Sequence, residues 1–267
     1  MFSKSLLAIG IALLPATFAT PIALEKRALA NYVEEVTIHS SCNTTQRRQL
    51  SKALSDTWEL VSMAKEYTYT NGANDSLYEL YFGDGPITNV IGAFDVVLKS
   101  NKDGVLLRCD DIDGNCRLPG WRGHWRGENG TAETVICDAS YTDRKSNDQF
   151  CAFGYTVAGS SPSYYFGTDL LHRLYHVPQI TDGKVEHYAD SYDECLELAK
   201  NNGTFATLNT HSLQYYANHV FAIEVAQGGE SCIGRADVAG ASSTPATATS
   251  SAALACHTHA DGALHCE

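Results

Sequence analysis

The sequence predicts an α+β domain that is mainly helical, with short strands and disulfide bonds. In several long stretches, apolar residues recur three or four positions apart, which is the helical period. Between residues 100 and 165 the texture changes, and Gly, Asp and Cys interrupt short apolar runs. Nine cysteines in 267 residues favour a disulfide-stabilised chain. Helices grouped around a short-stranded middle are typical of the α+β class.

The first predicted helix covers residues 42–66, where apolar residues fall on one face and Asn43 or Thr44 can cap the start. Gly83-Asp-Gly-Pro86 interrupts the helical region that follows. In chain order, the further helical segments are expected at residues 77–82, 87–99, 170–176, 186–199 and 211–225.

Short strands are expected in the middle of the chain, at residues 104–107 and 134–137. Four cysteines of this region are disulfide candidates: Cys109, Cys116, Cys137 and Cys151. The first two bracket a six-residue loop and the last two bracket a longer one. The other cysteines of the body are Cys42, Cys195 and Cys232. Because seven is an odd number, one of them is free or pairs elsewhere, and spacing does not give the connectivity.

The two ends of the chain differ from its body. Residues 1–19 have the charged start, short apolar run and small-residue cleavage site of a secretory signal peptide. A dibasic pair at residues 26–27 predicts a second cleavage. The expected organisation is a signal peptide at 1–19, a candidate pro-segment at 20–27, the main domain at 28–237, a Ser/Thr/Ala linker at 238–255 and a His/Cys-rich tail at 256–267.

Charge and hydropathy exclude several kinds of partner. The chain carries 19 Lys+Arg and 31 Asp+Glu, for a formal net charge of −12, so it repels phosphate and no nucleic-acid partner is expected. No stretch after the signal is apolar over the length of a membrane helix, so no membrane span is expected. Sequons predict N-glycosylation at Asn43, Asn74, Asn129 and Asn202. We therefore expect a secreted, extracellular glycoprotein.

A metal site is predicted in the second half of the chain. His172 and His176 are four residues apart on one face of a predicted helix, so both imidazoles can converge on one ion. A third histidine, His187, is expected on the next helical segment, with Asp190 one turn beyond it as an alternative or additional ligand. Three neutral imidazoles favour zinc, copper or nickel over calcium or magnesium. Because the ligands must be deprotonated, affinity should fall below about pH 6.5.

The tail is a second candidate metal site. Its potential ligands are Cys256, His257, His259, His265 and Cys266. In a secreted chain a Cys256–Cys266 disulfide is favoured, and its histidines either bind zinc or are merely solvated. On a flexible linker, the tail can collect or hand over metal, or complete a site in another subunit of a homo-oligomer. In contrast, His211 and His219 lie on a predicted core helix and are expected to be structural.

Several segments resemble fungal deuterolysin-like (aspzincin) metallopeptidases, and this resemblance implies a zincin-like, metallopeptidase-type domain. The segments that occur in the same order are the helix near Cys42, Tyr81-Phe82-Gly83, the loop between Cys109 and Cys116, the histidine pair and residues 209–217. Those enzymes carry His-Glu-x-x-His and a downstream Asp ligand. This chain instead has Arg173 at the Glu position and His187 near the Asp position, with Asp190 as the other candidate.

With these departures, the chain more closely resembles the fungal pH-regulated antigen family, a group of secreted zinc scavengers, or zincophores, that includes mould allergens. The resemblance is carried by His172-Arg-Leu-Tyr-His176, by His187-Tyr-Ala-Asp190 and by the His/Cys-rich tail, and it covers nearly the whole mature chain. It implies capture of Zn²⁺ outside the cell, delivery to a cell-surface zinc transporter, and contact with host immune proteins.

Arg173 favours binding over catalysis. In a zinc peptidase, the Glu takes a proton from metal-bound water and passes it to the leaving amine. Arginine has no acceptor and does not deprotonate in proteins, so Arg173 cannot be this base, and we expect it to turn away from the ion and pair with a carboxylate. Hydrolysis stays open if Tyr192, Glu186 or Glu194 carries the proton. The expected function is therefore a zincophore, with two alternatives: a deuterolysin-type zinc metalloendopeptidase, and a cell-wall or host-protein-binding antigen with structural zinc.

Overall fold

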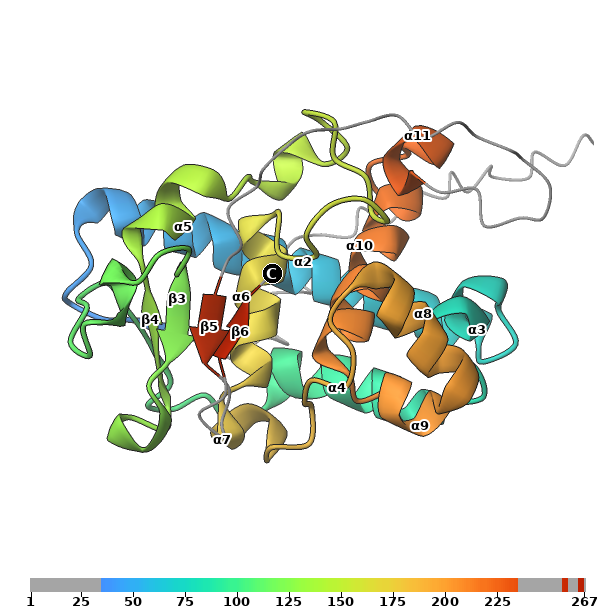
Figure 1. Ribbon diagram of the computed structural model, residues 1–267, viewed down its shortest axis with the longest axis horizontal. Coiled ribbons are helices and arrows are strands. Elements are labelled where there is room, and N and C mark those ends of the chain that lie inside the picture. Colours follow the sequence, from blue (N-terminus) through green and yellow to red (C-terminus); the bar gives the residue numbers. More distant parts are fainter. Residues whose placement is uncertain (1–34, 235–255, 259–263, 267) are drawn as a thin grey trace, which may run out of the picture. The chain divides into compact units, whose positions relative to one another are not determined.

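The long helix α2 (Thr44–Asn71) forms the first large element of the fold. The computed structural model describes residues 35–234, 256–258 and 264–266 (Figure 1). Asn43 caps α2 through a capping box, because its side chain accepts from the Gln46 N–H while the Gln46 side chain accepts from the Asn43 N–H. This confirms the predicted helix, which continues beyond residue 66 to Asn71.

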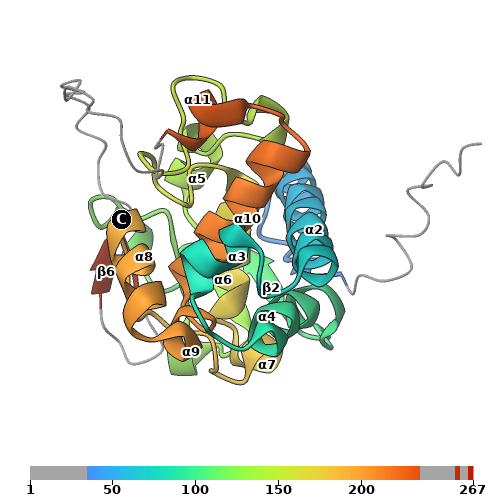
Figure 2. The same ribbon diagram turned by 90° about the vertical axis from the view of Figure 1, so that its right-hand side faces the viewer.

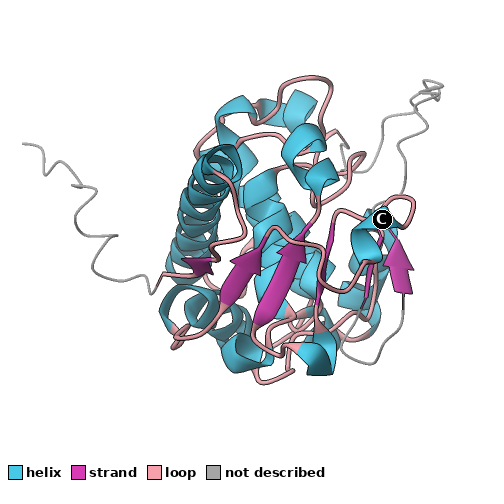
Figure 3. Cartoon of the chain, turned by 90° about the vertical axis from the view of Figure 1, so that its left-hand side faces the viewer, coloured by secondary structure: helices cyan, strands magenta, loops and turns pink. Residues whose placement is uncertain are grey.

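A four-stranded sheet lies in front of the helices in Figure 3, with the strand order β1-β2-β4-β3. Its strands are β1 (Thr37–Ile38), β2 (Leu106–Arg108), β3 (Gly123–Trp125) and β4 (Glu133–Ile136). β2 is parallel to both β1 and β4, whereas β3 is antiparallel to β4. β2 and β4 confirm the predicted strands to within two residues. β1 and β3 are too short for an alternating pattern to reveal them.

The remaining helices cover the rest of the body. They are α3 (Ser76–Phe82), α4 (Ile87–Lys99), α5 (Asp138–Asp143), α6 (Phe166–Tyr175), α7 (Pro178–Thr181), α8 (Tyr192–Asn201), α9 (Gly203–Ala206), α10 (Thr210–Glu224) and α11 (Gly229–Ile233), with short 3₁₀ turns η1 (Asn115–Arg117), η2 (Gly127–Asn129) and η3 (Asn147–Gln149). Helix α10 lies between α2 and α8 (Figure 2). The described body is therefore mainly helical, which confirms the predicted α+β class.

Helix α8 begins later than predicted, and this moves His187 off the helix. Ser191 caps α8 in a capping box with Glu194, so the helix starts at Tyr192 rather than at residue 186. The backbone of Glu186 instead pairs with the chain ahead of α10. Its N–H donates to the carbonyl of Leu208 at 3.0 Å, and its carbonyl accepts from the N–H of Thr210 at 2.9 Å. His187 therefore lies in the loop that directly follows this backbone pairing, and not in a helix.

Aromatic side chains fill the centre of the helical layer. Tyr81, Phe82, Phe94 and Tyr216 are fully buried, and the rings of Phe82 and Tyr216 have centroids 4.9 Å apart in an edge-to-face arrangement. Burying a large apolar side chain of this kind stabilises a fold by roughly 2–3 kcal/mol. This packing fixes α3, α4 and α10 against one another, and α10 later supplies part of the candidate site.

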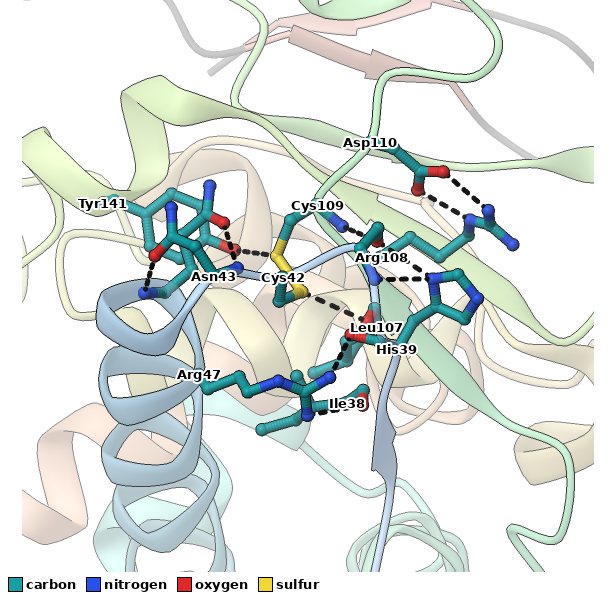
Figure 4. Close-up of a disulfide and its surroundings, with 12 residues drawn as sticks. Ile38, His39, Cys42, Asn43, Arg47, Leu107, Arg108, Cys109, Asp110 and Tyr141 are labelled. Carbon is teal, nitrogen blue, oxygen red and sulfur yellow. Dashed lines mark hydrogen bonds and ion pairs between the residues drawn. A yellow bond between two sulfur atoms is a disulfide. The ribbon is translucent and has the colours of Figure 1, made fainter.

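Three disulfides connect parts of the chain that are far apart in sequence: Cys42–Cys109, Cys116–Cys137 and Cys151–Cys232. All four body candidates are thus in disulfides, but neither bracketed loop closes on itself. The reason is visible in Figure 4, where the start of α2 lies beside the end of β2. Arg47 holds this junction by donating to the carbonyls of Ile38 and His39 at 3.0 and 2.7 Å.

Cys195 is the odd cysteine of the body. It is the free cysteine in the described part of the chain and is fully buried, which confirms that one of the seven does not pair internally. Burial raises the pKa of its thiol to about 12, and a thiol that stays protonated is a poor nucleophile.

The predicted end segments are described only in part. The signal peptide, the pro-segment, the linker at 238–255 and His259 lie outside the described residues. In the tail, β5 (Cys256–Thr258) and β6 (Leu264–Cys266) pair as antiparallel strands, with Cys256 opposite Cys266 and His257 opposite His265. In the described part of the chain, no helix combines the length and the apolar character that a membrane span requires. The four sequon asparagines are exposed, so each remains a glycosylation prediction.

Candidate metal centre

Three imidazoles meet at the C-terminal end of α6. His172 lies in α6 and is 2% exposed, and His176 is the C-cap of the same helix. Their Nε2 atoms are 3.1 Å apart, and Nε2 of His187 lies 3.0 Å from Nε2 of His176. The predicted triad of His172, His176 and His187 therefore comes together, although His187 arrives from a loop rather than from a helix.

Gln214 fixes the orientation of His172. The amide nitrogen of Gln214 donates to Ser163 Oγ and to the Thr168 carbonyl, both at 3.0 Å, so its Oε1 is the atom that faces His172. This oxygen can only accept, and Nδ1 of His172 donates to it at 3.1 Å. The proton of the neutral ring is then on Nδ1, and the Nε2 lone pair points at the other imidazoles.

Asp190 has the same effect on His187. Its Oδ1 lies 3.3 Å from Nδ1 of His187, so the carboxylate accepts the Nδ1 proton and leaves Nε2 as a lone-pair donor. The same oxygen lies 3.6 Å from Nδ1 of His211. Asp190 therefore lies behind two rings, in the place of a residue that orients histidine ligands.

His211, in the first turn of α10, also lies in this cluster and is therefore a further candidate ligand, whereas the sequence predicts a structural role for it. One ring nitrogen on each of His172, His187 and His211 lies within 4.8 Å of the others. The His211 ring is fully buried, and its centroid is 5.3 Å from that of His172 and 4.7 Å from that of His187. Sequence spacing did not reveal it, because His211 follows His187 by more than twenty residues and sits in an apolar helix.

The other histidine of this helix, His219, lies in a buried, aromatic environment. His219 packs against Tyr81, whose hydroxyl lies 3.0 Å from Nδ1 of His219. Burial lowers the pKa of His219 to about 4, so its ring is neutral at pH 7. A second grouping, of His124 with Cys116 and Cys137, offers no thiolate ligands because the two cysteines form a disulfide.

Arg173 points away from the imidazoles and pairs with a carboxylate, as expected. Its Nε and Nη2 donate to the two oxygens of Asp169 at 2.8 and 3.1 Å, and Arg144 donates to the same carboxylate at 2.9 Å. The guanidinium reaches β3, where a Cβ on Gly123 would lie 2.5 Å from Nη1 of Arg173 and 2.5 Å from the Val135 carbonyl oxygen. Glycine at position 123 therefore makes room for the arginine.

Two of the expected substitute proton carriers have structural roles. The carboxylate of Glu194 accepts from the backbone N–H groups of Ser191 and Asp190 at 2.9 and 3.2 Å. These backbone hydrogen bonds, with the Ser191 side chain, lower the pKa of Glu194, so it is an ionised helix cap. The buried ring of Tyr192 packs edge-to-face on Tyr81 and Tyr215.

The geometry and the donor types fit a zinc ion. In a tetrahedral site with Zn–N bonds of about 2.0–2.1 Å, two ligand nitrogens are about 3.3 Å apart. The Nε2 separations of 3.0 and 3.1 Å are close to this value. The hydrogen bonds described above leave a lone pair on Nε2 of His172 and on Nε2 of His187. Both lone pairs face Nε2 of His176, and one N–H group on His176 cannot donate a well-aligned hydrogen bond to both. One dication accepts all of these lone pairs at once.

The match to a known family includes this constellation. The family described as "HRXXH: Putative peptidase family" matches residues 14–235. This chain belongs to the HRXXH family. The family's five letters correspond to His172, Arg173 and His176 with two residues between, so the arginine is part of the family pattern.

Relatives in the HRXXH family confirm the predicted likeness to pH-regulated antigens. The major allergen Asp f 2 of Aspergillus fumigatus is 42% identical, with 89% of this chain and 86% of the relative covered. Antigen 1 of Emericella nidulans is 47% identical, with 84% and 79% covered. The pH-regulated antigen PRA1 of Candida albicans is 41% identical, with 81% and 72% covered. A solved zinc peptidase from Grifola frondosa matches at a TM-score of 0.48 and 18% identity, covering 67% of this chain and 97% of that one.

Proposed function

We propose that this protein binds zinc outside the cell as a zincophore, with His172, His176, His187 and His211 as ligands and Asp190 as the residue that orients two of them. The observation that carries the proposal is the position of His176 Nε2, which lies 3.1 Å from Nε2 of His172 and 3.0 Å from Nε2 of His187. Neutral imidazoles are ligands for zinc rather than for calcium or magnesium. His211 is the proposed fourth donor, because one of its ring nitrogens lies within 4.8 Å of ring nitrogens of His172 and His187.

The position of Arg173 supports storage and transfer of the ion rather than hydrolysis. A zinc peptidase needs a base beside the metal-bound water and an open coordination position. Here Arg173 is held by Asp169, and Glu194 is used as a helix cap. A site of nitrogen donors with an arginine at the position of the catalytic glutamate is suited to binding an ion and releasing it unchanged.

The wider role follows from the resemblance and from the relatives' names. We propose secretion, delivery of the captured ion to a cell-surface zinc transporter, and cell-wall association or contact with host immune proteins. Support comes from the relatives named as an allergen and as antigens, since such proteins are encountered by a host outside the cell. The predicted signal peptide and the four exposed sequons are consistent with that location.

The tail is proposed as an additional zinc-binding segment, through His257, His259 and His265. Opposite residues of antiparallel strands have Cα atoms about 4.5–5.5 Å apart, a distance that a disulfide spans. The backbone register of β5 and β6 therefore supports a Cys256–Cys266 disulfide. The tail is also the proposed element by which one copy could complete a site in another copy.

A metal count on purified protein tests the site. We expect at least one tightly bound zinc per wild-type chain, loss of that ion in the His172→Ala/His176→Ala double variant, and at least tenfold weaker binding in His211→Ala. A His39→Ala variant is the matched control, because His39 follows β1 and its ring contacts Ser41 rather than the other histidines. A chain ending at residue 250 should lose only the weaker tail sites. Full stoichiometry in the double variant would refute the body site.

Two further measurements separate the alternatives. Chelator-sensitive cleavage of a peptide library by pure protein, absent in His172→Ala, would establish the metalloendopeptidase instead. For structural zinc, the chelated wild-type protein should lose its folded near-ultraviolet circular dichroism. A zincophore should stay folded without the ion and should exchange it with a competing chelator.

A further inference from the structure

A cavity of about 470 Å³ opens between α2 and the segment that joins α5 to α6, away from the histidine cluster. Its volume is within the range of ordinary small-molecule sites. Its lining includes Arg48, Lys52 and Asp56 of α2, Arg144 and Lys145 after α5, and the aromatic rings of Tyr141 and Phe166. None of these residues belongs to the proposed zinc site.

The lining is basic although the whole chain is acidic. The lining has four cationic side chains and one carboxylate, in a protein whose net charge is −12. Lys52 also pairs with Asp148 and Arg144 pairs with Asp169, so, among the lining residues that the structure describes, the positive charge that is not paired belongs to Arg48 and Lys145. Within the described residues, Arg48 is exposed and has no carboxylate partner. The amine of Lys145 lies 5.9 Å from the centroid of the Phe153 ring, which leaves its positive charge unneutralised. These two side chains make the mouth of the cavity attractive to an anion.

The one carboxylate in the lining is already bound by the protein. Asp56 accepts from Lys52 at 2.6 Å, from the Asn147 N–H at 3.1 Å and from Ser146 Oγ at 3.2 Å. Deeper in the cavity, the Arg144 side chain is only 6% exposed and is fixed through its hydrogen bond to Asp169. Because this guanidinium is already fixed, it loses little conformational entropy when it binds an oxyanion.

One wall of the cavity is aromatic. Tyr141 and Phe166 meet edge to face, with ring centroids 5.7 Å apart. The hydroxyl of Tyr141 lies 2.9 Å from the Cys109 sulfur, so the ring is fixed beside the disulfide (Figure 4). Burial raises the pKa of Tyr141, so the ring adds no negative charge at neutral pH.

We propose that this cavity binds a small organic anion. Its phosphate or carboxylate group would lie among Arg48, Arg144 and Lys145, and its apolar part would lie against Tyr141 and Phe166. Guanidinium groups bind both kinds of oxyanion through paired N–H donors. The proposal is independent of the zinc site, since it uses different residues.

Isothermal titration calorimetry at constant ionic strength tests the proposal on the zinc-loaded protein. The probes are phenyl phosphate, benzoate, inorganic phosphate and the neutral benzyl alcohol. We expect saturable binding of phenyl phosphate or benzoate, with the tighter of the two identifying the preferred acid group. Inorganic phosphate should bind at least fivefold more weakly than phenyl phosphate, because it makes no contact with the aromatic wall. Benzyl alcohol should not bind.

The variants locate the site. Arg48→Gln changes an exposed helix residue and should weaken binding of the anions at least fivefold, and adding Lys145→Gln should weaken it further. Lys184→Gln, which removes a charge from an exposed residue elsewhere, should leave it unchanged. Anion binding that survives the double variant would overturn the proposal and point to the metal ion as the anion's partner. Failure of both aromatic anions to bind would overturn it as well.

Discussion

At the scale of single residues, the histidine cluster depends on groups that contact the far side of each ring. Gln214 accepts a hydrogen bond from Nδ1–H of His172, and Asp190 accepts one from Nδ1–H of His187. The Nε2 lone pairs of the two rings are therefore directed toward the same point without a bound ion. Groups of this kind commonly change metal affinity by 10- to 100-fold when they are removed. Gln214 is the more tightly fixed of the two, because it is fully buried and its amide nitrogen also donates to Ser163 and to the Thr168 carbonyl.

Replacing Gln214 tests this role. We expect Gln214→Leu to weaken zinc binding by roughly 10- to 100-fold, since the buried Nδ1–H of His172 loses its acceptor and the ring can adopt the other tautomer. The measurement is competition with a chromogenic chelator, on protein whose circular dichroism shows that it is folded. Gln149→Leu, at an exposed position, is the control. An unchanged affinity in folded Gln214→Leu would contradict the assignment.

His219 makes stability depend on pH. The unfolded chain takes up a proton near pH 6.5, whereas the folded chain does so only near the lowered pKa of about 4. Between these values the unfolded state binds more protons, so the free energy of unfolding falls as the pH drops, by about 1.4 kcal/mol per unit and about 3 kcal/mol in all. Above pH 6.5 the effect is absent.

Chemical denaturation of chelated protein at several pH values measures this dependence. The His219→Gln variant should lose stability at every pH through altered packing, and its unfolding free energy should change less than that of wild type between pH 6.5 and 4. The comparison of slopes isolates His219 from the other histidines. If the unfolding free energy had the same pH dependence in the two proteins, folding would not lower the pKa of His219.

At the scale of elements, the N-terminal cap of α8 lies next to the loop that carries His187, one of the proposed zinc ligands. The capping box of Ser191 and Glu194 starts α8, and the carboxylate of Glu194 also accepts from the N–H of Asp190. Asn209 supports the same segment, since its Oδ1 accepts from the N–H groups of Tyr188 and Ala189 at 2.8 and 3.1 Å. The His187 loop is therefore tied both to α8 and to the start of α10.

Removing that cap should loosen the loop. We expect Ser191→Ala to cost about 1 kcal/mol of stability and to weaken zinc binding severalfold, because an N-cap is lost next to the His187 loop. Asn43→Ala, made in unglycosylated protein, removes the capping box of α2 and is the matched control. It should cost similar stability and leave zinc binding unchanged. A zinc affinity that falls equally in both variants would show only general destabilisation.

At the scale of the whole molecule, disulfides restrain the unfolded chain over long loops. The Cys151–Cys232 bond joins residues 81 positions apart, whereas Cys116–Cys137 joins residues 21 apart. On chain entropy alone, the longer loop stabilises the fold by about 4.5 kcal/mol and the shorter by about 3.4 kcal/mol. Replacing each pair by alanine and measuring urea unfolding checks the order. A larger loss from the Cys116 and Cys137 replacement would contradict it.

The sequence predicts what is local and misses what folding brings together. Helix α2 and the His172/His176 pair follow from spacing within one helix, and both are found in the structure. The position of His187 was predicted on a helix, because the sequence from 186 to 199 has helical texture and the cap at Ser191 went unrecognised. The disulfide partners and His211 depend on long-range packing. The Asn209-Thr-His211 segment at a helix start was the one signal for it, and its apolar surroundings concealed it.

The four imidazoles come from three stretches of chain: the end of α6, the loop before α8 and the first turn of α10. A single dication held by all of them would act as a removable cross-link, in addition to the hydrogen bonds that Glu186, Asn209 and Gln214 already make between these segments. Because a ligand that prefers the native state stabilises it by RT ln(1 + [L]/Kd), the melting temperature would rise steadily with the logarithm of free zinc. The protein would then report the zinc concentration of its surroundings through its own heat resistance, without any dye or label.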